Sequence, residues 1–404
     1  DEQLLEYSRL FISRLRDKYT SNRLIELAEK VRKEGITEEV SEYMNNFSKS
    51  EVIKSSYEDA FDKFEEFYKN TEKELGMKLL VDDFDKKTGG IHAGQLVTIL
   101  GFAGSFKTTY AANIAFSAMK DGFNVLYLSL EVPRNDMTAN FLARQSYEVG
   151  FKPLDVDDIR KKLLDEEKAK YLFEEVKPAF QKQEGNIYIL DETDLDNYSF
   201  FALEEKFREI EQKATEDTGH GLDLVVIDHA QLLKFTGNMS SVGAETSVIN
   251  MYISFFRQQC INFCHLKKQC SFLVLSQANR EGWLYATKHG GMYRLTALAD
   301  ANELERASSI IISVFTDEGL KATNRAKVAL IKSRNSETSL EAGEISVVPK
   351  HYAFGDITEK TDSMFGGDMR DLFVKDEQVD VSQADYSSLD AGTSVFGLDS
   401  ALGI

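Results

Sequence analysis

The chain has 404 residues, of which 42% are hydrophobic and 11% aromatic, so it can bury a full core and form one large domain beside a smaller element. Its net charge of −19 argues against a protein that coats nucleic acid with its whole surface, because phosphates are neutralised by clustered Lys and Arg, but a local basic channel remains compatible with it. No apolar run approaches the roughly 18 residues of a membrane helix, and the first residues are charged, unlike a secretory signal. These features indicate a cytosolic protein without a membrane partner.

Residues 1–76 show helical periodicity with many charges. Near the end of this segment, aromatic residues recur at intervals of four, three and three, namely Tyr57, Phe61, Phe64 and Phe67. Such a stripe is typical of a packing face, either against the following domain or against a neighbouring subunit, and less typical of a ligand site. We therefore expect a helical N-terminal arm or linker.

Residues 77–352 alternate short apolar runs with helical stretches. Continuous apolar strands separated by helices are typical of a mainly parallel sheet that is covered on both faces. We therefore expect an α/β domain with a mainly parallel central sheet. The predicted strands are residues 95–101, 124–131, 186–192, 222–228, 271–277, 309–315 and 326–333.

The first predicted strand leads into ILGFAGSFKTT, a segment with the composition of a phosphate-binding loop. Backbone N–H groups of such a loop and the positive end of the following helix bind polyphosphate oxygens. Lys107 is placed to reach the β and γ phosphates, and Thr108 to hold magnesium through its hydroxyl. A strand-to-helix turn without a ligand is the alternative. The residues predicted to bind the nucleotide are Gly101, Ala103, Gly104, Ser105, Phe106, Lys107, Thr108 and Thr109.

One position departs from the phosphate-loop pattern GxxxxGK[ST], which has Gly immediately before the Lys. Phe106 occupies that position, so its side chain must point away from the phosphates if the loop is to close. The departure leaves weak nucleotide binding as an alternative.

The run LDLVVIDHAQLL places Asp228 at the end of a buried strand. A carboxylate there can organise magnesium-bound water, although an Asp at a strand end is also a common turn or helix cap. Together with the phosphate-binding loop, it predicts a magnesium site formed by Thr108 and Asp228.

Six runs occur in the order seen in the motor domain of DnaB-type hexameric replicative helicases: DDFDKKTGGIHAGQLVTILG, VLYLSLEVP, VVIDHAQLL, LSQANRE, ADANELERASSIIISVF and ALIKSRN. The chain resembles that family over about residues 80–350. The resemblance implies a RecA-like P-loop NTPase core that uses ATP, or another NTP, together with Mg²⁺. It also implies a homo-oligomer, for which we expect a hexamer.

The resemblance further implies roles for individual residues. Glu131 resembles the catalytic glutamate that polarises water for attack on the γ phosphate, and Gln277 the γ-phosphate sensor. Lys332 and Arg334 match the position that supplies positive charge to the nucleotide of the adjacent subunit, with Arg334 as the arginine finger. The alternatives are a turn acid, a polar strand end and two surface cations, respectively.

Two segments rich in Gly, Ser and Asn, residues 235–245 and 280–294, are predicted as loops at strand ends. In the resembled family, loops at these places grip the backbone of single-stranded DNA. Lys288 and Arg294 are the predicted DNA contacts, because the first loop has no Lys or Arg between Thr236 and Met251. Solvated loops without DNA contact are the alternative.

The last segment, residues 353–404, is an acidic tail with eleven Asp and Glu against three Lys and Arg from Gly355 onward. We expect it to be flexible, with docking of a partner as the alternative. The first 76 residues are too few for the N-terminal domain and linker helix of DnaB proteins, as in shortened, phage-type relatives. A bacterial or phage-infected cytoplasm and a primase, loader or other replisome partner follow from this resemblance.

The sequence therefore predicts a ring-forming, ATP-dependent DNA helicase that translocates on single-stranded DNA in replication. A RecA- or RadA-like recombinase shares the core but forms filaments, and the order of the motifs after residue 270 favours the helicase. A nucleotide-binding assembly or scaffold protein that has lost hydrolysis is the alternative from another class, motivated by Phe106 and the acidic surface.

Overall fold

The computed structural model describes residues 61, 64–65, 76–150, 152–195, 197–233, 244–266, 268–298 and 302–355. The predicted helical arm, apart from residues 61, 64–65 and 76, lies outside these residues. So do the acidic tail from residue 356 onward and residues 234–243, which include most of the first predicted DNA-facing loop.

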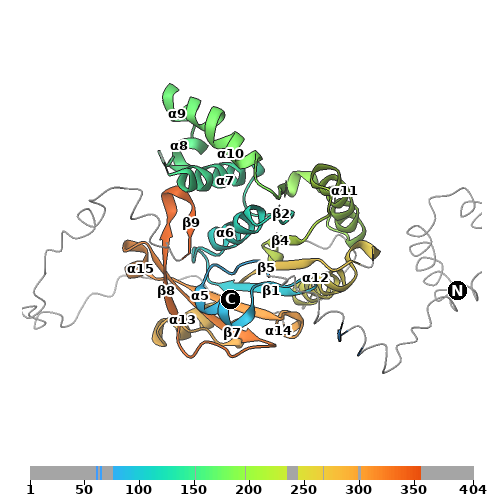
Figure 1. The fold of residues 1–404 in the computed structure, drawn as a ribbon. Helices are drawn as coiled ribbons and strands as arrows, with labels where there is room; N and C mark the ends of the chain where they lie inside the picture. The colour runs from blue at the N-terminus through green and yellow to red at the C-terminus, as the bar shows by residue number, and fades with distance from the viewer. Residues whose placement is uncertain are drawn as a thin grey trace, which may run out of the picture. The chain divides into compact units, whose positions relative to one another are not determined.

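A nine-stranded sheet forms the centre of the described part of the chain, in the order β3-β2-β4-β5-β1-β6-β7-β8-β9 (Figure 1). The pairs from β3 to β6 are parallel, whereas β6 to β9 pair antiparallel. This arrangement confirms the predicted α/β class. The strands are β1 (Leu96–Gly101), β2 (Val125–Ser129), β3 (Ile187–Asp191), β4 (Leu224–Asp228), β5 (Ser271–Gln277), β6 (Ile310–Phe315), β7 (Arg325–Ser333), β8 (Gly343–Val348) and β9 (Ala353–Phe354).

The seven predicted strands agree with β1 to β7, and their ends differ by about two residues at most. Most of their apolar runs are buried on both faces, as in β1, where all six residues are buried, whereas β3 is mainly half-buried. The sequence did not predict β8 and β9, because β8 mixes exposed and buried side chains and β9 has two residues. β9 extends the sheet to Phe354, past the expected domain end at residue 352.

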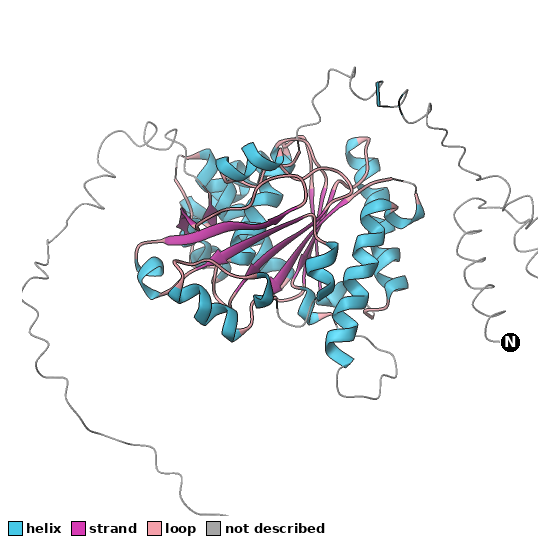
Figure 2. Cartoon of the chain, turned by 90° about the horizontal axis from the view of Figure 1, so that it is seen from below, coloured by secondary structure: helices cyan, strands magenta, loops and turns pink. Residues whose placement is uncertain are grey.

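Helices lie on both sides of this sheet (Figure 2). Among the described residues, none of them is both long and apolar enough to cross a membrane. The α-helices are α5 (Asp82–Thr88), α6 (Lys107–Lys120), α7 (Arg134–Val149), α8 (Val156–Arg160), α9 (Glu166–Tyr171), α10 (Lys177–Gln181), α11 (Phe200–Thr218), α12 (Ala244–Ile261), α13 (Arg280–Lys288), α14 (Asn302–Ala307) and α15 (Glu318–Ala322).

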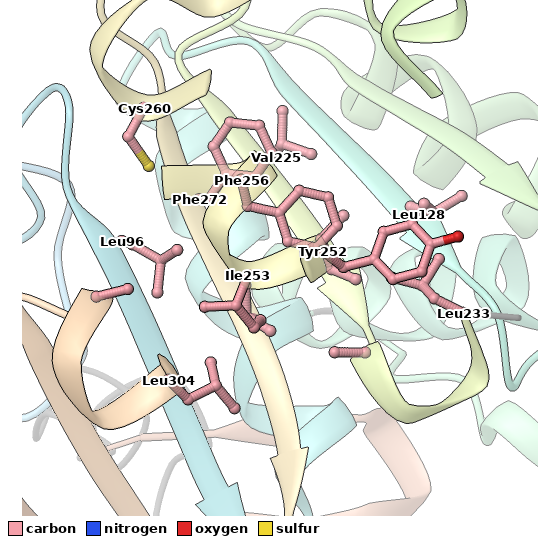
Figure 3. Close-up of a cluster of buried hydrophobic side chains, with 14 of the residues drawn as sticks. Leu96, Leu128, Val225, Leu233, Tyr252, Ile253, Phe256, Cys260, Phe272 and Leu304 are labelled. Carbon is pink, nitrogen blue, oxygen red and sulfur yellow. The ribbon is translucent and has the colours of Figure 1, made fainter. Parts of the chain in front are cut away.

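Two buried clusters join the helices to the two faces of the sheet. Because successive side chains of a strand point to opposite faces, Leu96 and Leu100 of β1 pack in the cluster with α11 and α12. Val97 and Ile99 pack in the cluster with α6 and α7. Figure 3 shows part of the first cluster, which includes Phe256 of α12. The clusters hold the carboxyl ends of the central strands in a fixed frame.

The prediction of a loop over residues 280–294 was wrong for its first part, which forms helix α13. The side chain of Asn279 caps this helix by accepting a hydrogen bond from the Gly282 N–H at 2.7 Å. Its buried residues are Gly282 and Ala286, and a Cβ atom at Gly282 would lie 2.2 Å from the Cβ of Ala297. The two buried positions of α13 are thus small residues, and Trp283 is the large side chain of this helix that packs against the core. The last two residues of the other predicted loop, 244 and 245, begin helix α12.

Candidate active site

The carboxyl ends of four neighbouring parallel strands, β2, β4, β5 and β1, meet at one edge of the sheet. Open parallel sheets bind their ligands at this edge. The segments that follow these strands enclose a cavity of about 290 Å³, which we call the edge cavity. Its lining residues are Ala103, Gly104, Ser105, Phe106, Lys107, Thr108, Thr109, Glu131, His229 and Gln277. The structure thus brings together most residues that the sequence predicted to handle the nucleotide.

The loop after β1 folds back on itself because Gly101 has no side chain. A Cβ atom there would lie 2.4 Å from Ser105 Oγ and 2.6 Å from the backbone oxygen of Val314. Helix α6 then begins at Lys107, and its first N–H groups have no intrahelical partners. Ser105 Oγ is buried without a hydrogen-bond partner in the described part of the chain. A bound phosphate would satisfy these groups, so the loop fits a polyphosphate.

Phe106, the residue that departs from the phosphate-loop pattern, has left-handed backbone angles of φ 66° and ψ 21°. Glycine adopts this conformation freely, whereas other residues are destabilised by roughly 1–2 kcal/mol. The half-buried side chain packs against the buried cluster on the α6 face of the sheet. The loop therefore keeps the backbone shape that the pattern requires, although a phenylalanine stands where glycine is favoured.

Lys107 lies almost buried at the start of α6, and its Nζ donates to the Phe102 carbonyl at 3.0 Å. Burial lowers the pKa of this ammonium group to about 8, against the opposing influence of Asp228 and Glu131. An anion in the edge cavity would stabilise the charged form. The geometry therefore suits Lys107 to a phosphate ligand.

Asp228 ends β4 as a buried carboxylate with two hydroxyl donors. The hydroxyl of Tyr127 donates to it at 2.8 Å and that of Thr108 at 3.2 Å. Burial raises the pKa of Asp228 to about 6, because these neutral donors offset the desolvation of the carboxylate only in part. Hydroxyl and carboxylate oxygens are the ligands that Mg²⁺ prefers, so Thr108 and Asp228 fit a magnesium ion.

Glu131 follows β2 and lines the edge cavity with a side chain that is 57% exposed. Its Oε2 lies 3.6 Å from Nε2 of His229, whose side chain is only 13% exposed. The sequence did not single out His229, because its nearness to Glu131 depends on the pairing of β2 with β4. The nearest signal is its position directly after Asp228.

Gln277 ends β5 and pairs in register with Gly101 of β1. It lines the edge cavity together with Glu131 and Lys107. A carboxylate, an ammonium group and an amide thus face one space that also adjoins the predicted magnesium ligands. This set can bind a nucleoside triphosphate and activate a water molecule beside it.

Comparison with known proteins agrees with this geometry. Residues 76–349 match the model of the DnaB-like helicase C-terminal domain. The chain belongs to the DnaB-like helicase family. This membership confirms the predicted resemblance and disfavours the recombinase alternative.

Individual relatives are distant. The chain is 22% identical to replicative DNA helicase DnaB of Rickettsia conorii (strain ATCC VR-613 / Malish 7) over 261 residues, which are 62% of this chain and 47% of the relative. It is 21% identical to replicative DNA helicase DnaB of Leifsonia xyli subsp. xyli (strain CTCB07) over 261 residues, or 63% of this chain and 51% of that protein. The matched segment thus spans about half the length of these relatives.

Two solved structures are similar to the fold of this DnaB-like chain. The first is the ATPase domain of another protein, with a TM-score of 0.59 at 17% identity, and the match covers 75% of this chain and 99% of that one. The second is a DnaB-like replicative helicase, described together with its interactions with primase. It has a TM-score of 0.60 at 17% identity, and the match covers 88% of this chain and 79% of that one. These similarities confirm the predicted RecA-like core.

Lys332 and Arg334 lie at the opposite edge of the sheet from the edge cavity. Ser333, between them, pairs with Ile310 at the start of β6. Arg334 donates to the carbonyls of Arg306 at 2.7 Å and Ala307 at 3.2 Å, and Lys332 donates to that of Glu305. Both cations thus stabilise the carboxyl end of α14. Within one DnaB-like chain they do not reach the edge cavity, so a role at a nucleotide requires a second copy.

Lys288 and Arg294, the predicted DNA contacts, are both exposed on the segment that contains α13. The guanidinium carbon of Arg294 lies 3.9 Å from the ring centroid of Tyr285. The ring of His289 stacks on the same Tyr285 with centroids 3.8 Å apart. This surface offers the cations and aromatic faces that single-stranded nucleic acid favours.

Helix α13 also contacts the phosphate-binding loop. The rings of Phe102 and Trp283 stack with centroids 5.4 Å apart. In addition, the N–H of Ala278 donates to the Gly101 carbonyl at 2.9 Å. The segment with the predicted DNA contacts is therefore packed directly on the loop that adjoins the edge cavity.

Proposed function

We propose that this protein is an ATP-dependent, ring-forming DNA helicase that translocates on single-stranded DNA in replication. The observation that carries the proposal is the edge cavity itself. Lys107, Thr108, Glu131 and Gln277 line it, Asp228 adjoins it, and a chain of the DnaB-like helicase family supplies all five. The positions and partners of these residues support hydrolysis rather than passive binding.

Each residue has a task that its position allows. Backbone N–H groups at the start of α6 and the Lys107 ammonium bind the β and γ phosphates of ATP. Thr108 and Asp228 hold Mg²⁺, which neutralises phosphate charge when it is bound. Glu131 orients the attacking water and accepts its proton, while the bond from the γ phosphorus to the ADP oxygen breaks.

The two cations at the far edge of the sheet extend this scheme to an oligomer. Lys332 and Arg334 are held by carbonyls of their own chain and would supply positive charge to the nucleotide of a neighbouring copy. Because each copy offers an edge cavity on one side and cations on the other, a head-to-tail ring satisfies every site. We propose a hexamer with Lys288 and Arg294 contacting DNA phosphates.

The remaining proposals follow from the family. The arm of residues 1–76 and the tail after Phe354 flank the motor domain in the sequence. A primase, loader or other replisome protein is the proposed partner, in a bacterial or phage-infected cytoplasm. One similar helicase structure concerns interactions with primase.

Phe106 favours a second candidate, a scaffold protein that binds a nucleotide without hydrolysing it. The left-handed backbone at this position is strained for a phenylalanine, which can weaken binding. The approach of Lys107, Glu131 and Gln277 to one cavity argues for the motor instead.

Steady-state ATP hydrolysis with and without single-stranded DNA distinguishes the two candidates. We expect DNA-stimulated turnover in the parent and a loss of about a thousandfold or more in Glu131→Gln, because the amide cannot accept the proton of water. Glu205→Gln is the matched control, because Glu205 is an exposed residue of α11, and this variant should behave as the parent. No turnover in a well-formed oligomer would favour the scaffold.

A further inference from the structure

A chain of polar side chains leads away from Glu131 into the sheet. Nε2 of His229 lies 3.6 Å from the Glu131 carboxylate, and Nδ1 of the same ring lies 3.2 Å from the Gln231 amide. The other end of that amide lies 3.0 Å from the hydroxyl of Ser276. Ser276 is fully buried in β5, directly before Gln277. The exposed carboxylate thus lies within charge-contact distance, beyond a direct hydrogen bond, of a ring that is hydrogen-bonded toward the rigid centre of the sheet.

The donors and acceptors of this chain can be assigned. Nε2 of the His229 ring faces a carboxylate and Nδ1 faces an amide, so a neutral ring with one donor and one acceptor can serve both. Since a carboxylate only accepts hydrogen bonds, the proton belongs on Nε2, facing Glu131. The Gln231 amide is placed with its oxygen toward Nδ1 and its nitrogen toward Ser276. A half-turn of the amide exchanges these two atoms without changing its shape, so that its nitrogen donates to Nδ1 and its oxygen accepts from the Ser276 hydroxyl.

Glu131 requires such support because of its place in the fold. It lies just beyond the end of β2, and more than half of its side chain is exposed. A long side chain in that setting samples several rotamers, whereas activation of water requires a single orientation. A misplacement of about 1 Å in such a group can lower a rate roughly a hundredfold.

We propose that His229 is a positioning residue that holds the Glu131 carboxylate toward the edge cavity, anchored through Gln231 on Ser276. The inference rests on the proposed ATP hydrolysis and adds a residue to it. Because Ser276 precedes Gln277, the anchor of the base and the predicted γ-phosphate sensor belong to one strand. Strand β5 therefore fixes the position of the water-activating group relative to that of the sensor.

Steady-state kinetics of His229 variants in the full chain test this role. We expect His229→Ala to lower kcat about 10- to 100-fold while KM for ATP changes less than about twofold, because phosphate binding does not depend on the ring. The affinity for ADP, measured by calorimetry, and the oligomeric state should match the parent. His220→Ala is the control, since this exposed histidine pairs with Asp223 and does not line the cavity.

Two conservative variants separate positioning from general damage. The amide nitrogen of Gln reaches the place of Nε2, so His229→Gln should recover kcat to within about fivefold of the parent. The shorter amide of Asn reaches only the place of Nδ1, so His229→Asn should remain as slow as His229→Ala. Equal losses in all three variants would refute the role.

The double variant Glu131→Gln/His229→Ala adds a further criterion. If His229 acts through Glu131, the double variant should be no slower than Glu131→Gln alone. Parental kcat in His229→Ala, or a rise in KM with kcat unchanged, would overturn the inference while leaving the proposed function intact. Equal turnover in the parent and Glu131→Gln would instead refute the proposed function, and the inference with it.

Discussion

The charged groups at the two edges of the parallel sheet interact with different kinds of partner. At the edge cavity, two carboxylates, Glu131 and Asp228, face one nearly buried cation, Lys107, whose pKa is lowered to about 8 by burial. At the opposite edge, Lys332 and Arg334 donate to backbone carbonyls at the end of α14. One edge thus collects acids beside the nearly buried Lys107, and the other presents cations held by carbonyl oxygens. The difference supports the proposed site divided between two copies of the chain.

Mixing two inactive variants tests the divided site most directly. Arg334→Ala should lower turnover by about a thousandfold or more, because a finger stabilises charge in the transition state. In rings mixed with Glu131→Gln subunits, about one interface in four would regain both groups, and turnover should reappear. The control is Arg325→Ala, which replaces an exposed arginine at the start of β7, the strand that ends directly before Arg334. Mixtures that stay inactive would contradict a divided site.

Removal of the buried charge at Asp228 should separate activity from stability. The pKa of Asp228 is raised to about 6, so the folded protein is destabilised by the ionised form above that pH, and no penalty remains below about pH 4. Asp228→Asn should therefore increase the free energy of unfolding by roughly 2–3 kcal/mol at pH 7 and by little at pH 4. Turnover should be lost because magnesium loses a ligand. Chemical denaturation at both pH values checks this, and an unchanged stability at pH 7 would contradict it.

Substitution of Phe106 tests whether the phosphate-binding loop is strained. Phe106→Gly should relieve roughly 1–2 kcal/mol of left-handed strain and tighten ATP binding several-fold. Phe106→Ala keeps the strain and loses the packing of the ring, so it should lower stability without tightening binding. Calorimetric affinities of the two variants distinguish these effects. Weaker binding by both variants than by the parent would show that the ring itself supports the nucleotide.

The smallest effect concerns the exposed cations near α13. Lys288→Ala should weaken binding to single-stranded DNA a few-fold and reduce the slope of log affinity against log salt by about 0.7 per lost phosphate contact. Lys213→Ala on α11 should leave both unchanged. Binding measured over a salt series provides the comparison, and equal slopes for the parent and Lys288→Ala would exclude a phosphate contact.

The sequence predicted the parts of this molecule that local pattern determines. Strands β1 to β7 are visible because their apolar runs are continuous, and most of these runs are buried on both faces. Helix α13 was missed because its two buried residues, Gly282 and Ala286, are small, and Trp283 alone adds a large side chain to the core. Hydrophobic pattern therefore identifies large buried side chains better than close backbone packing.

The sequence predicted which residues form the candidate site, but only part of how they lie relative to one another. The spacing of Lys107 and Thr108 and the strand-end position of Asp228 indicated a phosphate and magnesium site from neighbouring residues alone. The approach of His229 to Glu131 joins residues almost a hundred positions apart, and it depends on the register of β2 against β4. The separation of Arg334 from the edge cavity likewise follows from the pairing of β7 with β6. Predicting either feature requires knowledge of how the strands pair in the sheet.

The stack of Phe102 on Trp283 also gives the protein a built-in optical probe. Trp283 is the only tryptophan among 404 residues, so all tryptophan fluorescence comes from this one side chain. That place lies between the phosphate-binding loop and the surface with Lys288 and Arg294. Tryptophan emission changes with the polarity and packing around the ring, and here it would respond to events on either side. Fluorescence of the unlabelled protein therefore provides a test of the proposed nucleotide and DNA binding, with Phe102→Leu as the variant that tests the origin of the signal.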